Sequence, residues 1–150
     1  MQTFLPYKDF NKSAKALDNK RLGKQRVEVK QILNALDGQS KGWTNHPATK
    51  MWAGYREALA NYGIAICNEW RSRGYNDSLL PEFAVRKQSY IVMGEINKPA
   101  WLGDERLHTS HQSNLIRKDP IFYIPVFGEI PDDLPYVWFN PDGTIKELGE

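Results

Sequence analysis

One carboxylate in a basic stretch near the N-terminus has neighbours that suit chemistry on a sugar–phosphate backbone. Glu28 follows four cationic side chains, at positions 20, 21, 24 and 26, and the α-amine of Met1 belongs to the same third of the chain. A neutral amine is a nucleophile, and a carboxylate near it can transfer protons or stabilise positive charge on a sugar. The ordinary pKa of an α-amine is about 7.7–8.0, against about 10.4 for lysine, so more of the α-amine is neutral near pH 7.

The positive charge is concentrated in this part of the chain. Residues 8–30 contain eight Lys or Arg and three acids, whereas residues 131–150 contain five acids and one lysine. A basic N-terminal third is typical of a protein that binds a polyanion, most often nucleic acid. The alternative is a solvated helix face, on which Glu28 would form an ordinary surface ion pair with Lys24, four residues before it.

Length and composition favour a single globular domain over residues 1–150. Hydrophobic residues make up 41% of the chain and charged residues 25%, as in soluble proteins. No apolar run approaches the roughly 18 residues of a membrane span, and the first residues do not resemble a signal peptide. The lone Cys67 excludes an internal disulfide and is expected to be a buried, inert thiol. We therefore expect a cytoplasmic protein that does not cross a membrane.

The spacing of apolar residues predicts the first helix, which positions these groups. Asp18 suits an N-cap and Gly38 a stop, and the apolar stripe between them predicts a helix near 18–37, preceded by a short helix or turn near 9–16. The side chains at positions 21, 24, 25 and 28 then share one face of that helix. Helical spacing therefore gathers the charges beside Glu28.

The rest of the chain has less regular apolar spacing. A second long helix is expected from Asn45-His46-Pro47 to Gly74, with Asn45 as its cap and with Gly63 marking a kink or a close contact. Residues 75–104 read as mainly loop, with a candidate short strand at 89–93. A third helix is expected at 105–118, followed by an aromatic, Pro-broken tail. The expected fold class is all-α: one compact domain of about three main helices with long loops and an aromatic-rich C-terminal tail.

Other catalytic templates are weak or missing. His108 and His111 are spaced i, i+3 and could place two metal ligands on one helix face, but no Cys pair or His-Glu-x-x-His motif accompanies them. We expect these histidines to form hydrogen bonds or to contact phosphate. Gly-rich phosphate loops and the Gly-x-Ser-x-Gly motif are absent from the sequence. We therefore expect neither a metal nor another cofactor.

Three blocks in order carry a resemblance to a known family. In the first, Arg21-Leu22 is followed by Glu28, seven residues after Arg21. The second is Asn45-His46-Pro47 and a helix that stops at Arg73-Gly74-Tyr75-Asn76. The third runs from Ser110-His111-Gln112-Ser113-Asn114-Leu115 through Pro120-Ile121-Phe122-Tyr123 to Phe127-Gly128. Together they resemble the pyrimidine-dimer DNA glycosylases, the endonuclease V type that phage make for ultraviolet repair.

The resemblance implies a small α-helical fold in which the N-terminal segment runs between helices, so that the α-amine reaches the active site. It implies a DNA glycosylase with abasic-site lyase activity. The Met1 amine would attack C1′ of the damaged nucleotide and displace the base, and the resulting Schiff base would permit β-elimination and strand cleavage. Glu28 would be the catalytic carboxylate. The residues expected to contact DNA are Lys20, Arg21, Lys24, Arg26, His46, His111, Arg117, Lys118 and Tyr123.

The partner that the resemblance implies is double-stranded DNA with a damaged or modified base, such as a cyclobutane pyrimidine dimer. We expect a monomer without an obligatory protein partner, in the cytoplasm of a bacterium or of a phage-infected host. Three positions depart from the family pattern, one of them Ile124, where the family has a basic residue after the two aromatics of its tail. The family has Arg directly before its catalytic Glu, where this chain has Val27, and Gln2 is too large for the usual removal of Met1, so we expect Met1 to be retained.

Three alternatives stay open on the sequence. The first is a glycosylase or nuclease that acts on another modified base, and the second is a non-catalytic DNA-binding protein of the same fold. The third is a metal-dependent nuclease that uses His108 and His111.

Overall fold

The computed structural model describes residues 1–147, in which the regular elements are seven helices and an isolated β-bridge between Phe139 and Ile145. The helices are α1 (Phe10–Ala16), α2 (Asn19–Leu36), α3 (Pro47–Met51), α4 (Arg56–Ser72), α5 (Leu80–Val92), α6 (Glu105–Lys118) and α7 (Pro120–Phe127). The prediction of an all-α protein is confirmed for this range. Four helices of 13 to 18 residues, α2, α4, α5 and α6, correct the predicted number of three.

The helices α2 and α6 lie where the sequence predicts them. Asp18 is the N-cap residue of α2, and Gly38 follows its C-terminus with a φ of +78°, a conformation that glycine adopts without strain. The apolar stripe from Leu22 to Leu33 is buried. The helix α6 has the predicted limits, because Asp104 caps its first turn by accepting from the Arg106 N–H at 3.0 Å.

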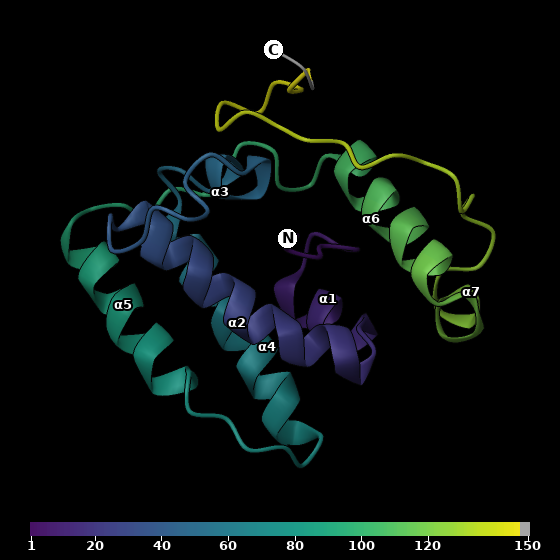
Figure 1. Ribbon diagram of the computed structural model, residues 1–150, viewed down its shortest axis with the longest axis horizontal. Coiled ribbons are helices and arrows are strands. Elements are labelled where there is room, and N and C mark those ends of the chain that lie inside the picture. The colour runs from purple at the N-terminus through teal and green to yellow at the C-terminus, as the bar shows by residue number, and fades with distance from the viewer. Residues whose placement is uncertain (148–150) are drawn as a thin grey trace.

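The helices α2, α4 and α5 lie together and form one half of the core (Figure 1). Gly63 makes this packing close, because a β-carbon at that position would lie 2.8 Å from Phe83 Cδ2 and 2.9 Å from Val29 Cγ1. The role of Gly63 is therefore close packing between three helices rather than a kink.

The second half of the molecule contains α6, α7 and the C-terminal segment, defined as residues 129–147. Figure 1 shows this segment, in yellow, passing over α6 toward α3. The N-terminal segment, defined as residues 1–6, lies between the two halves (Figure 1). This arrangement brings the start of the chain next to α2 on one side and α6 on the other.

The second predicted long helix is wrong in one respect, because α3 and α4 are separate helices. A turn divides them at residues 52–55, where Gly54 has a φ of +86°. The N-cap of α3 is His46 instead of Asn45: its Nδ1 accepts from the Ala48 N–H at 3.0 Å. The apolar pattern runs through the turn, since Trp52 is fully buried, and this continuity concealed the break.

The stretch predicted as mainly loop contains α5. The candidate strand at 89–93 is wrong, because residues 89–92 form the C-terminal end of that helix and Met93 is its C-cap. The helix buries only Phe83 and Tyr90, and other apolar side chains on it, such as Val85 and Val92, are exposed. Pro81 looked like a loop signal but lies in the first turn of the helix, where the missing N–H costs no intrahelical hydrogen bond.

The aromatic tail begins with another helix, α7. Pro120 occupies its first position, and the Asp119 carboxylate caps it by accepting from the Phe122 N–H at 3.2 Å. Gly128, with a φ of +68°, follows its last residue. The prolines that we predicted for this region lie both inside α7, where Pro125 is an interior residue, and in the C-terminal segment.

Candidate functional site

Side chains from two helices hold the N-terminal segment inside the protein. Gln25 on α2 makes two of these contacts: its Oε1 accepts from the Phe4 N–H at 2.9 Å, and its Nε2 donates to the Gln2 carbonyl at 2.9 Å. The hydroxyl of Tyr62 on α4 donates to the Phe4 carbonyl at 2.6 Å. Because buried backbone groups must be paired, these bonds fix the path of the segment without a neighbouring strand.

Two histidines on α6 hold the same segment from the other side. His111 Nδ1 accepts from the Leu5 N–H at 2.8 Å, and His108 Nδ1 lies 2.7 Å from the Leu5 carbonyl oxygen. His108 Nε2 accepts from the Gly103 N–H at 3.0 Å, so the proton is on His108 Nδ1, which donates to Leu5. These histidines form hydrogen bonds, as predicted, and their partners are backbone groups.

Glu28 is a buried carboxylate beside the N-terminal segment. It is 6% exposed, and its Oε2 accepts from Gln25 Nε2 at 2.8 Å and from the Gln2 N–H at 3.4 Å. Lys24 Nζ lies 3.9 Å from its Oε1. Burial raises the pKa of Glu28, although the Gln2 hydrogen bond and the charges of the α-amine and Lys24 act in the opposite direction. An ordinary surface ion pair therefore does not describe this group.

A cavity of about 350 Å³ opens at this point, and we call it the site cavity. Its lining residues are Met1, Gln2, Phe4, Lys20, Arg21, Lys24, Gln25, Glu28, Lys118 and Tyr136. Four of these are cations, Lys20, Arg21, Lys24 and Lys118, which we call the basic rim. Three of the four come from α2, and Lys118 is the last residue of α6. Within this lining Glu28 is the one carboxylate, so the cavity combines an amine, a carboxylate and a surface that attracts anions.

Three other residues predicted to contact DNA are engaged elsewhere. Arg26 Nε donates to the Asp77 carboxylate at 2.6 Å. His111 is 1% exposed and Tyr123 is fully buried. The Tyr123 hydroxyl bonds the carboxylate of Asp18 and accepts from the Asp18 N–H at 2.9 Å, which ties α7 to the start of α2. These positions argue against direct DNA contact by Arg26, His111 and Tyr123.

His46 and Arg117 lie near the site but outside the cavity lining. His46 caps α3, and its pKa is lowered by partial burial and by the charge of the α-amine. Arg117 is exposed, and its Nη1 donates to the Asp132 carbonyl at 2.7 Å. Arg117 therefore helps to hold the C-terminal segment.

Four lining residues were not among the sequence candidates: Gln2, Phe4, Gln25 and Tyr136. Gln25 was placed on the face of Glu28, and the available signal was a neutral amide three residues before the carboxylate in a run of cations. Tyr136 joins the cavity from the C-terminal segment, more than 100 residues away along the chain. Local sequence offers no signal for that contact.

Replacing Gln25 with Leu is expected to lower the free energy of unfolding by about 3 kcal/mol, because it leaves buried backbone groups of the N-terminal segment without partners. Urea unfolding followed by circular dichroism measures the change. Gln31→Leu, a half-buried position on the same helix, is the matched control and should change stability much less. Equal losses in the two variants would show that the bonds of Gln25 do not stabilise the segment.

The stability of the protein should decrease as the pH falls below 6.5, partly because of His111. Burial, with a smaller effect from His108, lowers the pKa of His111 from 6.5 to about 3. Between these values the unfolded chain binds a proton that the native state does not, so acid favours unfolding in this window. Glu28 has the opposite effect on stability: because its pKa is raised, its contribution to stability decreases as the pH rises above 4.5.

The contribution of His111 is isolated by comparison with His111→Asn. The Asn side-chain oxygen can take the place of Nδ1 as the acceptor for the Leu5 N–H but does not titrate. Urea unfolding between pH 7 and pH 4 should therefore show a shallower pH dependence in the variant than in the wild type. Parallel curves would contradict a titration of His111 on unfolding.

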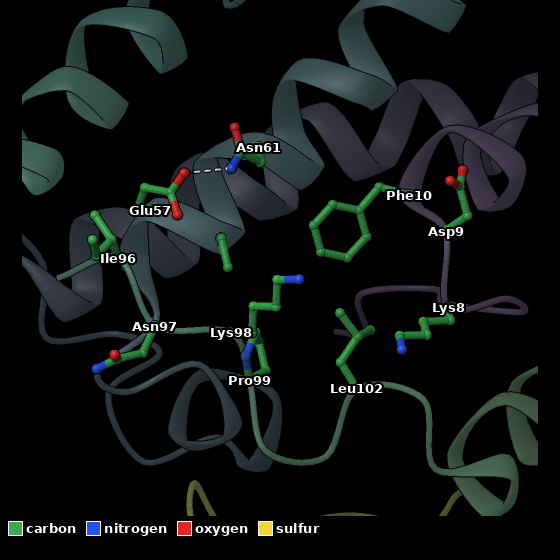
Figure 2. Close-up of a pocket in the computed structure, with 11 residues that line it drawn as sticks. Lys8, Asp9, Phe10, Glu57, Asn61, Ile96, Asn97, Lys98, Pro99 and Leu102 are labelled. Carbon is green, nitrogen blue, oxygen red and sulfur yellow. Dashed lines mark hydrogen bonds between the residues drawn. The ribbon is translucent and has the colours of Figure 1, made fainter.

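A larger cavity, of about 600 Å³, lies away from these residues. Figure 2 shows Phe10, Pro99 and Leu102 around it, and on α4 the carboxylate of Glu57, which accepts from Asn61 Nδ2 at 2.5 Å. Its two lysines are exposed, and its acids are half-buried or exposed. It lacks the amine and buried carboxylate that mark the site cavity, so we do not assign the chemistry to it.

Some predicted features concern groups outside the site. Cys67 is buried as predicted, and burial raises its thiol pKa to about 12. Among residues 1–147, no group of three or more His, Cys, Asp or Glu side chains is arranged to hold a metal ion. None of the helices in that range combines the length and the apolar character that crossing a bilayer requires.

Comparison with known proteins identifies a family for the N-terminal half of the chain. A family model described as pyrimidine dimer DNA glycosylase matches residues 1–81, which include Met1, Gln25, Glu28 and three cations of the basic rim. No curated protein and no solved structure matches the chain. Because the match covers more than half of the 150 residues, the chain belongs to the pyrimidine dimer DNA glycosylase family.

Proposed function

We propose that this protein is a DNA repair glycosylase with abasic-site lyase activity that uses the α-amine of Met1 as its nucleophile. The observation that carries the proposal is the site cavity, where Met1 and the buried Glu28 lie together inside the basic rim. Family membership supports DNA repair glycosylase activity. The cavity supports the finer assignment of an amine and a carboxylate to that activity.

In the first step the neutral α-amine attacks C1′ of the damaged nucleotide. The bond from C1′ to the base breaks, and the base leaves with the electron pair and takes up a proton. Positive charge develops on the sugar during this step, and the carboxylate of Glu28 stabilises it at short range. Loss of the base and opening of the sugar ring leave a protonated imine between the Met1 nitrogen and C1′.

In the second step the imine makes the C2′ hydrogen acidic. Glu28 accepts this proton, and the electron pair forms a C2′–C3′ double bond as the C3′–oxygen bond breaks and releases the 5′-phosphate of the next nucleotide. A carboxylate of raised pKa is a better proton acceptor than an ordinary one, which suits this role. Water then hydrolyses the imine and restores the free amine.

The substrate that we propose is duplex DNA that contains a cyclobutane pyrimidine dimer or an abasic site. The cations of the basic rim would bind the phosphates on either side of the reacting nucleotide. The reaction requires the nucleotide or its partner to leave the base stack, which costs less at a distorted dimer than in regular duplex.

Borohydride trapping tests the proposal. The purified protein is incubated in EDTA with duplexes that contain a thymine dimer or an abasic site, and the reduced adduct is mapped by mass spectrometry. An adduct on the Met1 nitrogen with both substrates is the expected result. An adduct with the abasic site alone would keep the lyase and assign a different base, whereas binding without any adduct would leave a DNA-binding protein without this chemistry.

A further inference from the structure

Asp18 contacts one cation of the basic rim. Its two carboxylate oxygens accept from Arg21 Nη1 at 3.3 and 3.4 Å. The side chain of Arg21 is 18% exposed, whereas that of Lys24 is 71% exposed. The other two rim cations, Lys20 and Lys118, are also exposed. Arg21 is therefore the rim cation whose position the protein restricts most.

The carboxylate of Asp18 is directed at side chains and not at the backbone of its own helix. Asp18 is the N-cap residue of α2, but within residues 1–147 its side chain accepts from no backbone N–H. The carboxylates of Asp9, Asp104 and Asp119 do cap the helices that follow them. An ion pair between positions i and i+3 adds little to the stability of a helix. Capping therefore does not account for the direction of the Asp18 side chain.

Tyr123 on α7 holds Asp18 in place. Its hydroxyl donates to Asp18 Oδ1 and accepts from the Asp18 N–H at 2.9 Å. The Tyr123 ring is fully buried, and its centre lies 5.6 Å from that of the stacked Phe127 ring. Burial raises the pKa of Tyr123, so the hydroxyl stays a neutral donor. A buried ring thus holds Asp18, and Asp18 holds Arg21 at the lining of the site cavity.

The contact with Asp18 uses one nitrogen of the Arg21 guanidinium and leaves two others for a ligand. In the described range, residues 1–147, Arg21 Nε and Nη2 have no hydrogen-bond partner. These two nitrogens form the planar fork with which arginine binds two oxygens of a carboxylate or a phosphate. Because Nη1 is anchored, the fork is held in one orientation at the cavity where Met1 and Glu28 meet.

We propose that Asp18, held by Tyr123, is a positioning residue that orients Arg21 so that its Nε and Nη2 bind a phosphate next to the reacting nucleotide. This inference rests on the proposed function and adds to it the residues that fix the phosphate contact. A phosphate bound to a fixed guanidinium limits where C1′ can lie and so keeps it near the Met1 amine. Tyr123 acts on the reaction without touching DNA, which agrees with its burial.

The test is a double-mutant cycle in single-turnover cleavage of an abasic duplex at saturating protein. Asp18→Asn keeps the size of the side chain, an oxygen for the Tyr123 hydroxyl and a residue type that suits an N-cap, but it removes the charge that holds Arg21. Arg21→Lys keeps the positive charge but removes the fork. Each variant should slow cleavage about 10- to 100-fold, the range for a hydrogen bond to a charged group. The double variant should be no slower than Arg21→Lys, because both changes remove the same interaction.

The direction of the effect separates this role from general electrostatics. By charge alone, the loss of an acid beside the basic rim should strengthen DNA binding, because DNA is a polyanion. We therefore expect Asp18→Asn to bind the duplex at least as tightly as the wild type and to cleave it more slowly. Asp9→Asn is the matched control: it removes the same charge at the N-cap of α1, outside the lining of the site cavity, and should cleave at the wild-type rate.

Tyr123→Phe provides a second measurement if thermal melting shows that Asp18→Asn does not fold. It removes only the hydroxyl, so it should slow cleavage by a smaller factor in the wild type and not at all in Arg21→Lys. Unchanged cleavage by Asp18→Asn, or losses that multiply in either double variant, would overturn the inference alone, because the wild type would still cleave the duplex. A wild-type protein that neither cleaves the abasic duplex nor forms a Met1 adduct would overturn the proposed function, and the inference with it.

Discussion

Strand cleavage at an abasic site is expected to fall by about 100- to 10,000-fold when Glu28 is replaced by Gln, the range for loss of a positioned acid–base group. The Gln side chain has nearly the same shape, and its carbonyl oxygen can still accept from Gln25 Nε2 and the Gln2 N–H. It cannot accept the C2′ proton, and it carries no negative charge to stabilise the sugar cation. The loss should therefore appear in kcat, with little change in DNA affinity.

The same substitution should make the protein more stable. The pKa of Glu28 is raised by burial, so the native state binds its proton more tightly than the unfolded chain does. Stability is then lost as the pH rises from 4.5 through the folded pKa, because ionisation of the buried group opposes folding. Gln does not ionise, so the melting temperature should increase near neutral pH, and the gain should shrink as the pH approaches 4.5.

Single-turnover cleavage of an abasic duplex and thermal melting at several pH values measure the two effects. Glu105→Gln, at an exposed position in the first turn of α6, is the control and should change neither. Retained cleavage by Glu28→Gln would remove the carboxylate from the mechanism. Lower stability with lost cleavage would indicate that the variant disturbs the N-terminal segment instead of the chemistry.

Acetylation of the Met1 α-amine is expected to abolish covalent trapping, and one glycine added before Met1 should reduce it about 100-fold or more, as expected when a reacting group is displaced. An extra residue moves the amine by about 3.8 Å. The segment cannot slide to compensate, because Gln25, Tyr62 and His111 hold the backbone of Phe4 and Leu5. DNA binding should persist in both forms, since the basic rim is unchanged.

Borohydride trapping and a binding assay with the same abasic duplex distinguish these effects. The matched control is one glycine added after Glu150, which should trap like the wild type. If the acetylated protein still forms an adduct, the nucleophile is a lysine, and Lys24, 3.9 Å from the carboxylate of Glu28, is the first to test by substitution with Arg.

The elements predicted well are those whose ends and periodicity agree. Both ends of α2 are marked by good cap and stop residues, and the stripe between them is apolar at regular spacing. The helix α5 was not predicted because it buries only two residues and has a proline at its second position, which we interpreted as a loop signal. The break between α3 and α4 was not predicted because Trp52 continues the apolar pattern through the turn.

The sequence by itself determined that Arg21, Lys24 and Glu28 share one helix face beside a basic stretch, because helical spacing sets which side chains are neighbours. Only the tertiary structure decided that Glu28 is buried and that Lys118 and Tyr136 complete its cavity. These contacts depend on the N-terminal segment lying between α2 and α6, where Leu5 is bound by a histidine 106 residues away. Pairings at such separations leave no local periodicity, since they arise from how packed helices satisfy buried backbone groups.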